Sequence, residues 1–176
     1  MSGHNKWSQI RRQKEKTDGA KSRIFSRFAK LITDEARKSD GNVSASGLKT
    51  AIERARAANM PTDNIERAIK KATGAEAKPM ETLLYEAYGP GGTAFLIEVL
   101  TDSRNRAAQE VKHVLAENSG NLAGRGAAMW AFSKSSEGYT AQTTVPVSEK
   151  DLAALEKLVD ALEALEDVQA VHTNAE

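Results

Sequence analysis

The sequence predicts an α+β protein with an N-terminal three-helix bundle followed by an α/β sandwich, whose antiparallel sheet carries two helices on one face. The length of 176 residues suits one large domain or two small ones. In the first half, apolar residues recur at helical spacing in three short segments, whereas strand-like runs interleave with helical segments after Met80. Charge divides in the same way: residues 1–78 carry 18 Lys+Arg and 9 Asp+Glu, and residues 79–176 carry 7 and 15.

Composition excludes several classes of protein. The chain has no cysteine, so it cannot form a disulfide, a thiolate nucleophile or a cysteine-based zinc finger. No apolar run approaches the roughly 20 residues that span a membrane, and no apolar segment typical of a secretory signal follows the N-terminus. We therefore expect a cytoplasmic protein without a membrane partner.

The first half is predicted to contain an arm, three helices and a linker. Residues 1–17 are basic and polar, with only Trp7 and Ile10 as large apolar groups, so we expect a flexible arm. The three-helix domain spans residues 18–74, and residues 75–79 form the linker. Its helices are expected over residues 18–38, with Thr17 or Asp18 as the cap, over residues 46–59, and from a cap at Asp63 to a stop at Gly74.

The second half, residues 80–176, is predicted to be the α/β domain. Its expected elements, in order, are strands at 83–88 and 93–101 around a turn at 89–92, a helix capped by Asp102 or Ser103 and ending near Asn118, strands at 127–132 and 139–147, a helix capped by Ser148, and a short strand at 167–172.

A cluster of cations near the N-terminus predicts nucleic-acid binding, because each neutralised phosphate releases condensed counterions. Trp7 lies among these cations, where it could stack on an exposed base or serve as a small hydrophobic anchor. The cations that we expect to contact phosphate are Lys6, Arg11, Arg12, Lys14, Lys16, Lys21, Arg23, Arg27 and Lys30.

Two further segments could supply secondary contacts. The second and third helices could imitate a helix-turn-helix, with Arg67, Lys70 and Lys71 near the DNA, although Asp63 and Glu66 would then face phosphate. Base-specific readout is therefore not expected. The segment 101–106 caps a helix and could also offer Arg104 and Arg106 to a phosphate.

Catalysis has no support in the pattern of residues. The three histidines, His4, His113 and His172, are scattered and lack the spacing of metal ligands. The glycine-rich segment 89–92 is followed by a strand rather than by the helix that a phosphate-binding loop requires. We expect no enzyme activity, no cofactor, no metal and no small-molecule substrate.

Several ordered blocks of residues resemble the YebC family, which includes PmpR-type regulators and the mitochondrial translational activator of cytochrome oxidase subunit I. They cover almost the whole chain. The blocks are Gly3-His4-Asn5-Lys6-Trp7, Ala58-Asn59-Met60-Pro61, Asn64-Ile65-Glu66-Arg67-Ala68-Ile69, Tyr85-Glu86-Ala87-Tyr88-Gly89-Pro90-Gly91-Gly92, Thr101-Asp102-Ser103-Arg104-Asn105-Arg106, Gly120-Asn121-Leu122 and Leu162-Glu163-Ala164-Leu165-Glu166-Asp167-Val168-Gln169.

The resemblance implies a cytoplasmic, non-enzymatic regulator of gene expression that binds DNA through the N-terminal arm and first helix, with His4, Lys6 and Trp7 among the contacts. It also implies an alternative, a translation factor that binds ribosomal RNA and relieves stalling at proline runs. A protein partner stays open. Family members carry an inserted domain that this chain lacks near residues 133–140, where only a short bridge joins the flanking strands.

Overall fold

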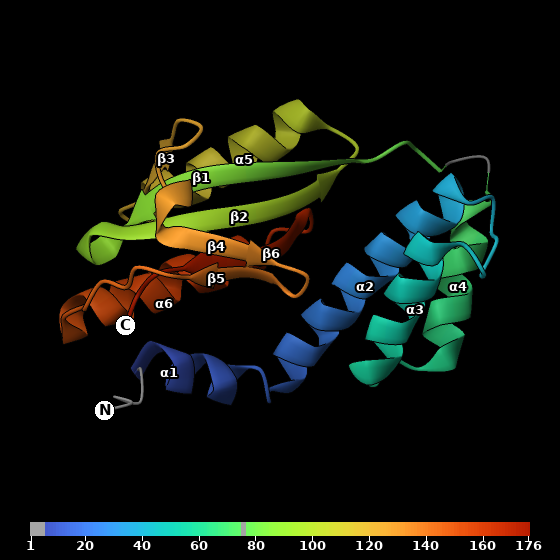
Figure 1. Cartoon of the computed structure of the whole chain (residues 1–176), viewed down its shortest axis with the longest axis horizontal. Coiled ribbons are helices and arrows are strands. Elements are labelled where there is room, and N and C mark those ends of the chain that lie inside the picture. The colour runs from blue at the N-terminus through green and yellow to red at the C-terminus, as the bar shows by residue number, and fades with distance from the viewer. Residues whose placement is uncertain (1–5, 75–76) are drawn as a thin grey trace. The chain divides into compact units, whose positions relative to one another are not determined.

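The computed structural model describes residues 6–74 and 77–176, which form two compact units (Figure 1). The three-helix unit is Lys16–Glu81, and the α/β unit is Thr82–Glu176 together with the described residues up to Glu15. Residues 75–76 of the predicted linker lie outside the described residues, as do residues 1–5. The predicted α+β class is confirmed.

The three-helix unit consists of α2 (Asp18–Lys38), α3 (Ser46–Ala57) and α4 (Thr62–Ala72). The expected apolar stripes form its core, in which Ile32, Leu48 and Ile65 are buried. Thr17 caps α2 as predicted, since its hydroxyl accepts a hydrogen bond from the backbone N–H of Ala20 at 3.2 Å. The predicted cap at Asp63 is wrong. The N-cap lies two residues earlier, at Pro61, which cannot provide a side-chain cap, so Asp63 is already within the helix.

The α/β unit is built on a four-stranded sheet in the order β3-β1-β2-β6. Its strands are β1 (Glu81–Gly89), β2 (Thr93–Thr101), β3 (Asn121–Ala123) and β6 (Val168–Thr173), and its helices are α5 (Arg104–Glu117) and α6 (Glu149–Glu163). Ser103 and Ser148 cap these helices as predicted, because each hydroxyl accepts a backbone N–H three residues on. The turn between β1 and β2 contains Gly91, whose φ of 73° favours glycine.

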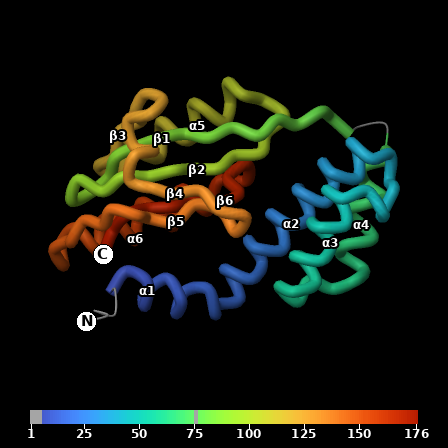
Figure 2. Tube along the Cα trace, viewed as in Figure 1, coloured from blue at the N-terminus to red at the C-terminus, as the bar shows by residue number. Residues whose placement is uncertain are grey.

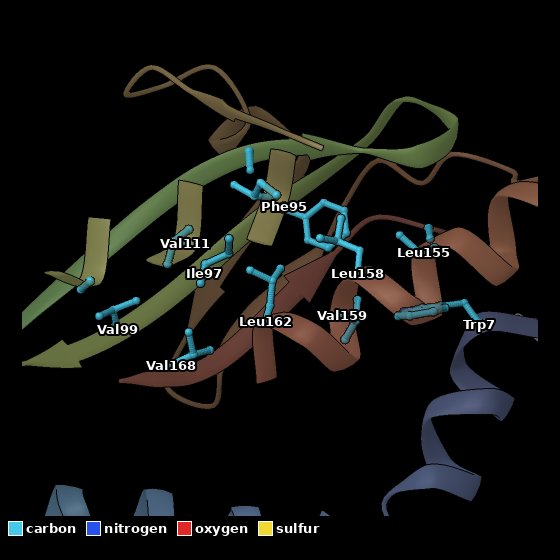
Figure 3. Close-up of a cluster of buried hydrophobic side chains, with 14 of the residues drawn as sticks. Trp7, Phe95, Ile97, Val99, Val111, Leu155, Leu158, Val159, Leu162 and Val168 are labelled. Atoms are coloured by element: carbon cyan, nitrogen blue, oxygen red, sulfur yellow. The ribbon is translucent and has the colours of Figure 1, made fainter. Parts of the chain in front are cut away.

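Strand β2 lies inside the sheet and is buried on both faces. Phe95, Ile97 and Val99 point to the side covered by α5 and α6, where they join the main hydrophobic cluster (Figure 3). The alternate residues Ala94 and Leu96 pack against a second, smaller cluster on the opposite face. Two helices on one face of the sheet match the prediction, and the tube in Figure 2 follows the chain through this arrangement.

The second cluster includes the segment where the predicted strands were wrong. The segment expected as a strand at 127–132 is mostly a turn and a short 3-10 helix, Met129–Ala131, and the strand β4 (Phe132–Ser135) starts where the prediction ends. The strand expected at 139–147 is short and shifted. It is β5 (Gly138–Ala141), which pairs with β4 in a separate hairpin. Strand β3 was not predicted, because it has only three residues.

The N-terminal segment differs most from its prediction. Residues Lys6–Lys14 of the expected flexible arm form a helix, α1, which belongs to the α/β unit. Its Trp7 is only 7% exposed and joins the main cluster, with Ile10 packed beside it. Figure 3 shows Trp7 beside Leu155 and Val159 of α6. The low apolar content of this segment predicted an arm, but the buried Trp7 and the neighbouring Ile10 attach it to the main cluster.

Candidate nucleic-acid interface

The cations of α1 face acidic groups of α6. Arg11 places Nη2 at 2.5 Å from Oε1 of Glu163 and Nη1 at 3.3 Å from Oδ1 of Asp160. Lys14 forms an ion pair with the other carboxylate oxygen of Asp160. Lys6 forms a more exposed pair with Glu149 at 3.3 Å. Three of the predicted phosphate contacts are therefore paired with carboxylates of the same unit.

Trp7 and Arg11 form one structural element of α1. The Arg11 guanidinium lies 5.6 Å from the centroid of the Trp7 ring, which is favourable for a cation–π contact. The side chain of Arg11 is 17% exposed. The anchor role considered for Trp7 matches its burial, and in this conformation the indole is not accessible for stacking on a base.

The remaining predicted contacts of the N-terminal segment are exposed or undescribed. Arg12 lies on α1 and Lys16 just after it, and both residues are exposed. His4 lies outside the described residues.

Helix α2 carries the next four predicted contacts. Lys21 is exposed, whereas Arg23, Arg27 and Lys30 are partly exposed. The last three are spaced i, i+4 and i+7, which places them on one face of the helix. This spacing can track a row of phosphates.

Helix α3 adds cations that were not predicted. The Arg54 guanidinium lies 5.9 Å from the centroid of the Phe28 ring, so this cation of α3 lies against α2. Arg56 and Lys49 are also exposed on α3. Their positions between the buried residues of a short amphipathic helix could have identified them in the sequence.

Acidic groups in α2 are largely engaged within that helix. Asp34 is 1% exposed and pairs with Lys38 at 2.6 Å and with Arg37 at 3.4 Å. The hydrogen bond from Lys38 to Asp34 outweighs burial and raises the pKa of this lysine. Lys38 also pairs with Glu35 at 3.1 Å. These pairs leave the C-terminal turn of α2 less basic than its sequence implies.

The predicted secondary contacts fall into two groups, of which the first lies on α4. Arg67, Lys70 and Lys71 are exposed on that helix, and Arg67 donates a hydrogen bond to Asn64 at 3.2 Å. Asp63 lies in the first turn of α4, where its charge disfavours entry of this helix end into a major groove.

The second group lies at the start of α5, where Arg106 has a structural role. Its guanidinium donates to Asp167 at 2.7 Å and to Asp102 at 2.8 Å, and these two hydrogen bonds raise its pKa. Asp167 is buried and also accepts from the Thr101 hydroxyl at 2.8 Å. Arg106 therefore ties the end of β2 to the loop before β6. Arg104, its neighbour in the first turn, is exposed.

The glycine-rich segment after β3 is held by a buried carboxylate rather than open to a phosphate. Glu86 accepts backbone N–H groups from Gly126 at 2.6 Å, Ala128 at 2.7 Å and Met129 at 2.9 Å. Burial by itself would raise the pKa of Glu86, but the three hydrogen bonds outweigh it and lower the pKa. This segment has its backbone donors directed inward to an internal anion.

The described part of the chain holds no metal-binding cluster and no membrane-spanning helix. No group of three or more histidine, aspartate or glutamate side chains there could hold a metal ion. Among the helices that the structure describes, none combines the length and apolarity needed to cross a bilayer.

Comparison with known proteins agrees with this architecture. The chain resembles a probable transcriptional regulatory protein of Halothermothrix orenii, with 43% identity over 96% of this chain and 66% of that protein. It also resembles one of Treponema pallidum, with 45% identity over 96% and 67%. A relative from Petrotoga mobilis is 48% identical over 76% of this chain and 54% of that protein. The chain thus spans about two thirds of the length of the relatives that it matches almost end to end.

A solved structure shares the fold. The crystal structure of a conserved hypothetical protein, Aq1575 from Aquifex aeolicus, has a TM-score of 0.75 and 29% identity over 90% of this chain and 91% of its own.

Family models match along nearly the whole sequence. The model of the TACO1/YebC protein N-terminal domain matches residues 5–75, and that of the TACO1/YebC second and third domain matches residues 80–138 and 133–175. The two matches to the latter model meet at residues 133–138, within the β4–β5 hairpin where we predicted the inserted domain to be missing. The resemblance found in the sequence is thereby confirmed: the chain belongs to the TACO1/YebC family.

Proposed function

We propose that this protein is a non-enzymatic regulator of gene expression that binds nucleic acid, duplex DNA in the first instance, through the basic surface of its three-helix unit. The observation that carries the proposal is the charge of that unit. Residues 16–81 contain 14 Lys+Arg and 9 Asp+Glu, whereas residues 82–176 contain 7 and 14. The printed names of several relatives, probable transcriptional regulatory proteins, support the same assignment.

The positions of the cations support one mode of binding. Arg23, Arg27 and Lys30 share one face of α2, and Arg54 is held against that helix by its contact with Phe28. A row of cations on a rigid helix favours contacts with the phosphate backbone, which fix position without reading sequence. Asp63 in the first turn of α4 opposes insertion of that helix end into a groove. We therefore expect strong salt dependence and weak sequence preference.

A charge-removal variant tests the proposal. In the full chain, Arg23→Ala, Arg27→Ala and Lys30→Ala together should weaken binding to a fluorescent random-sequence duplex. The slope of log K against log salt should fall by about one unit for each phosphate that the variant can no longer neutralise. Alanine preserves helix propensity, and circular dichroism checks the fold.

The matched control removes three exposed lysines from the α/β unit: Lys112→Ala, Lys150→Ala and Lys157→Ala. It changes net charge equally but should leave the salt slope unchanged. An equal fall in the slope for both variants would show that only overall charge matters, and would refute the assignment to α2.

The same assay distinguishes DNA from the ribosomal alternative. Binding to the duplex is compared with binding to a structured ribosomal RNA fragment, and the protein is sedimented through a gradient with ribosomes. Retention on ribosomes that is lost at raised salt, together with weak duplex binding, would replace DNA by ribosomal RNA as the target. Failure to bind any of the three would refute nucleic-acid binding altogether.

A further inference from the structure

Helix α1 carries four cations that we expect to contact phosphate, and three of them, Lys6, Arg11 and Lys14, are paired with carboxylates of the same unit. We infer that the contact between α1 (Lys6–Lys14) and α6 (Glu149–Glu163) is autoinhibitory: acidic groups of α6 occupy the cations of α1 that would otherwise contact nucleic acid. The inference rests on the proposed function and adds a regulatory step to it. We call this contact the α1–α6 lock.

The ion pairs of the lock use the same donors that a phosphate would use. Arg11 directs two guanidinium nitrogens at two different carboxylates, Glu163 at 2.5 Å and Asp160 at 3.3 Å. Lys14 shares Asp160. Guanidinium and ammonium groups bind carboxylate and phosphate oxygens with similar geometry, so these donors cannot serve α6 and a nucleic acid at once.

Charge distribution makes α6 a suitable competitor. Helix α6 carries Glu149, Asp151, Glu156, Asp160 and Glu163, and its only cations are Lys150 and Lys157. Helix α1 has the opposite composition, with no acidic residue in its first turn and three cations, Arg11, Arg12 and Lys14, in its last turn. The two helices are therefore electrostatically complementary, although their paired residues lie almost 150 positions apart in the chain.

The lock is built so that it can open. Helix α1 has nine residues, fewer than the roughly 12–15 that an isolated helix needs for marginal stability in water. Its apolar hold on the unit comes from Trp7 and Ile10, while most of its other residues are polar. Its helical conformation therefore depends on docking to α6, and polyanions that attract Arg11 and Lys14 compete directly with that docking.

Opening the lock should strengthen nucleic-acid binding. Where only a fraction of molecules is competent, the apparent dissociation constant is the intrinsic one divided by that fraction. Opening also exposes the Trp7 indole, which could then stack on a base, as considered from the sequence.

The test neutralises the carboxylates of the lock in the full-length protein. Asp160→Asn with Glu163→Gln neutralises both carboxylate partners of Arg11. The control, Glu137→Gln with Glu166→Gln, makes the same change in net charge at two exposed carboxylates outside the lock. Two measurements are made on each protein: hydrogen exchange of the amides of residues 6–14, and the affinity for a random-sequence duplex and an RNA hairpin at one fixed salt concentration.

We expect the lock variant to exchange the α1 amides about tenfold faster than wild type and to bind nucleic acid about three- to tenfold more tightly. The control should remain within about twofold of wild type in both measurements. Thermal unfolding checks that the α/β unit is intact.

Three outcomes would overturn the inference. Faster exchange with unchanged or weaker affinity would show that α1 is not withheld from nucleic acid. Unchanged exchange would show that these ion pairs do not hold α1. An equal gain in affinity for the control would assign the effect to overall charge. Failure of the proposed function is distinguishable, because wild type and both variants would then all fail to bind.

Discussion

Replacing Glu86 by glutamine should destabilise the α/β unit through the loop that this carboxylate organises. One oxygen of Glu86 accepts N–H groups from Ala128 and Met129, and the other accepts from Gly126. Glutamine keeps one acceptor oxygen but sets its NH₂ group against another donor. Hydrogen bonds to a charged group contribute about 1.5–3 kcal/mol each, and a buried donor left unpaired costs about 1–3 kcal/mol. We therefore expect the free energy of unfolding to fall by about 2–3 kcal/mol.

Urea unfolding followed by tryptophan fluorescence measures this change. Both tryptophans, Trp7 and Trp130, belong to the α/β unit, so the signal reports on the relevant transition. Trp130 is a close reporter, because its indole N–H donates to the Tyr88 hydroxyl at 2.9 Å. Glu137→Gln, a neutralisation at an exposed turn, should change the free energy of unfolding by less than about 0.5 kcal/mol.

The effect should also depend on pH. The folded-state pKa of Glu86 lies below its ordinary value of 4.5, so its contribution to stability is fully present above that value. The contribution is lost as pH falls through the folded pKa. Glutamine does not titrate, so the difference in stability between wild type and the Glu86→Gln variant should shrink at low pH. A difference that is constant from about pH 7 to about pH 3, or smaller than that of the Glu137 control, would refute this explanation.

Two further substitutions test one contact in each unit: the approach of Phe95 to Gly89 in the α/β unit, and the Asp34–Lys38 ion pair in the three-helix unit. A Cβ at Gly89 would come within 2.6 Å of the Phe95 ring, so Gly89→Ala should destabilise the α/β unit by about 1–3 kcal/mol. The control is Gly124→Ala, which should cost little because a Cβ there meets no atom within 4 Å. Equal melting temperatures for the two variants would contradict the predicted clash. Asp34→Asn removes the buried carboxylate partner of Lys38 and should lower the pKa of that lysine, measured by NMR. Because Lys38 is half exposed, the free energy of unfolding should fall by only about 1–2 kcal/mol. An unchanged pKa would show that the ion pair is not formed in solution.

The two proposals divide the basic residues between different tasks. The cations of α2 and α3 lie on the unit whose net charge is positive, and we assign to them the affinity for nucleic acid that does not depend on the α1–α6 lock. Three cations of α1, Lys6, Arg11 and Lys14, are paired with α6, and we assign them a conditional contribution. Weak binding by the wild-type protein that rises when α6 is neutralised would fit both assignments together.

The shorter length of this chain relative to its relatives bears on the α/β unit. The two matches to the second-and-third-domain model meet in the β4–β5 hairpin, next to the 3-10 helix that carries Trp130. Trp130 is 52% exposed, although its indole N–H is satisfied by Tyr88 and Ala127. The α/β unit nonetheless completes its sheet, because α6 and β6 follow the hairpin.

Local physics in the sequence determined most of the secondary structure. Stripes of apolar residues at helical spacing predicted the helices, and Thr17, Ser103 and Ser148 were each identified as capping positions or close alternatives, because a cap depends on residues within one turn. The family blocks and the charge asymmetry between the two halves could also be recognised in the sequence, since both depend only on the order of the residues.

Tertiary structure decided whatever depends on distant partners. The turn at residues 124–129 takes its form from Glu86, some forty residues earlier, and the local pattern that predicted a strand there does not include that anion. Helix α1 is the clearest case. Nine mostly polar residues cannot form a stable helix alone, and the indole pocket and the carboxylates of Asp160 and Glu163 that stabilise it are supplied by the opposite end of the chain. The sequence identified these cations but could not indicate that their first anionic partners are internal.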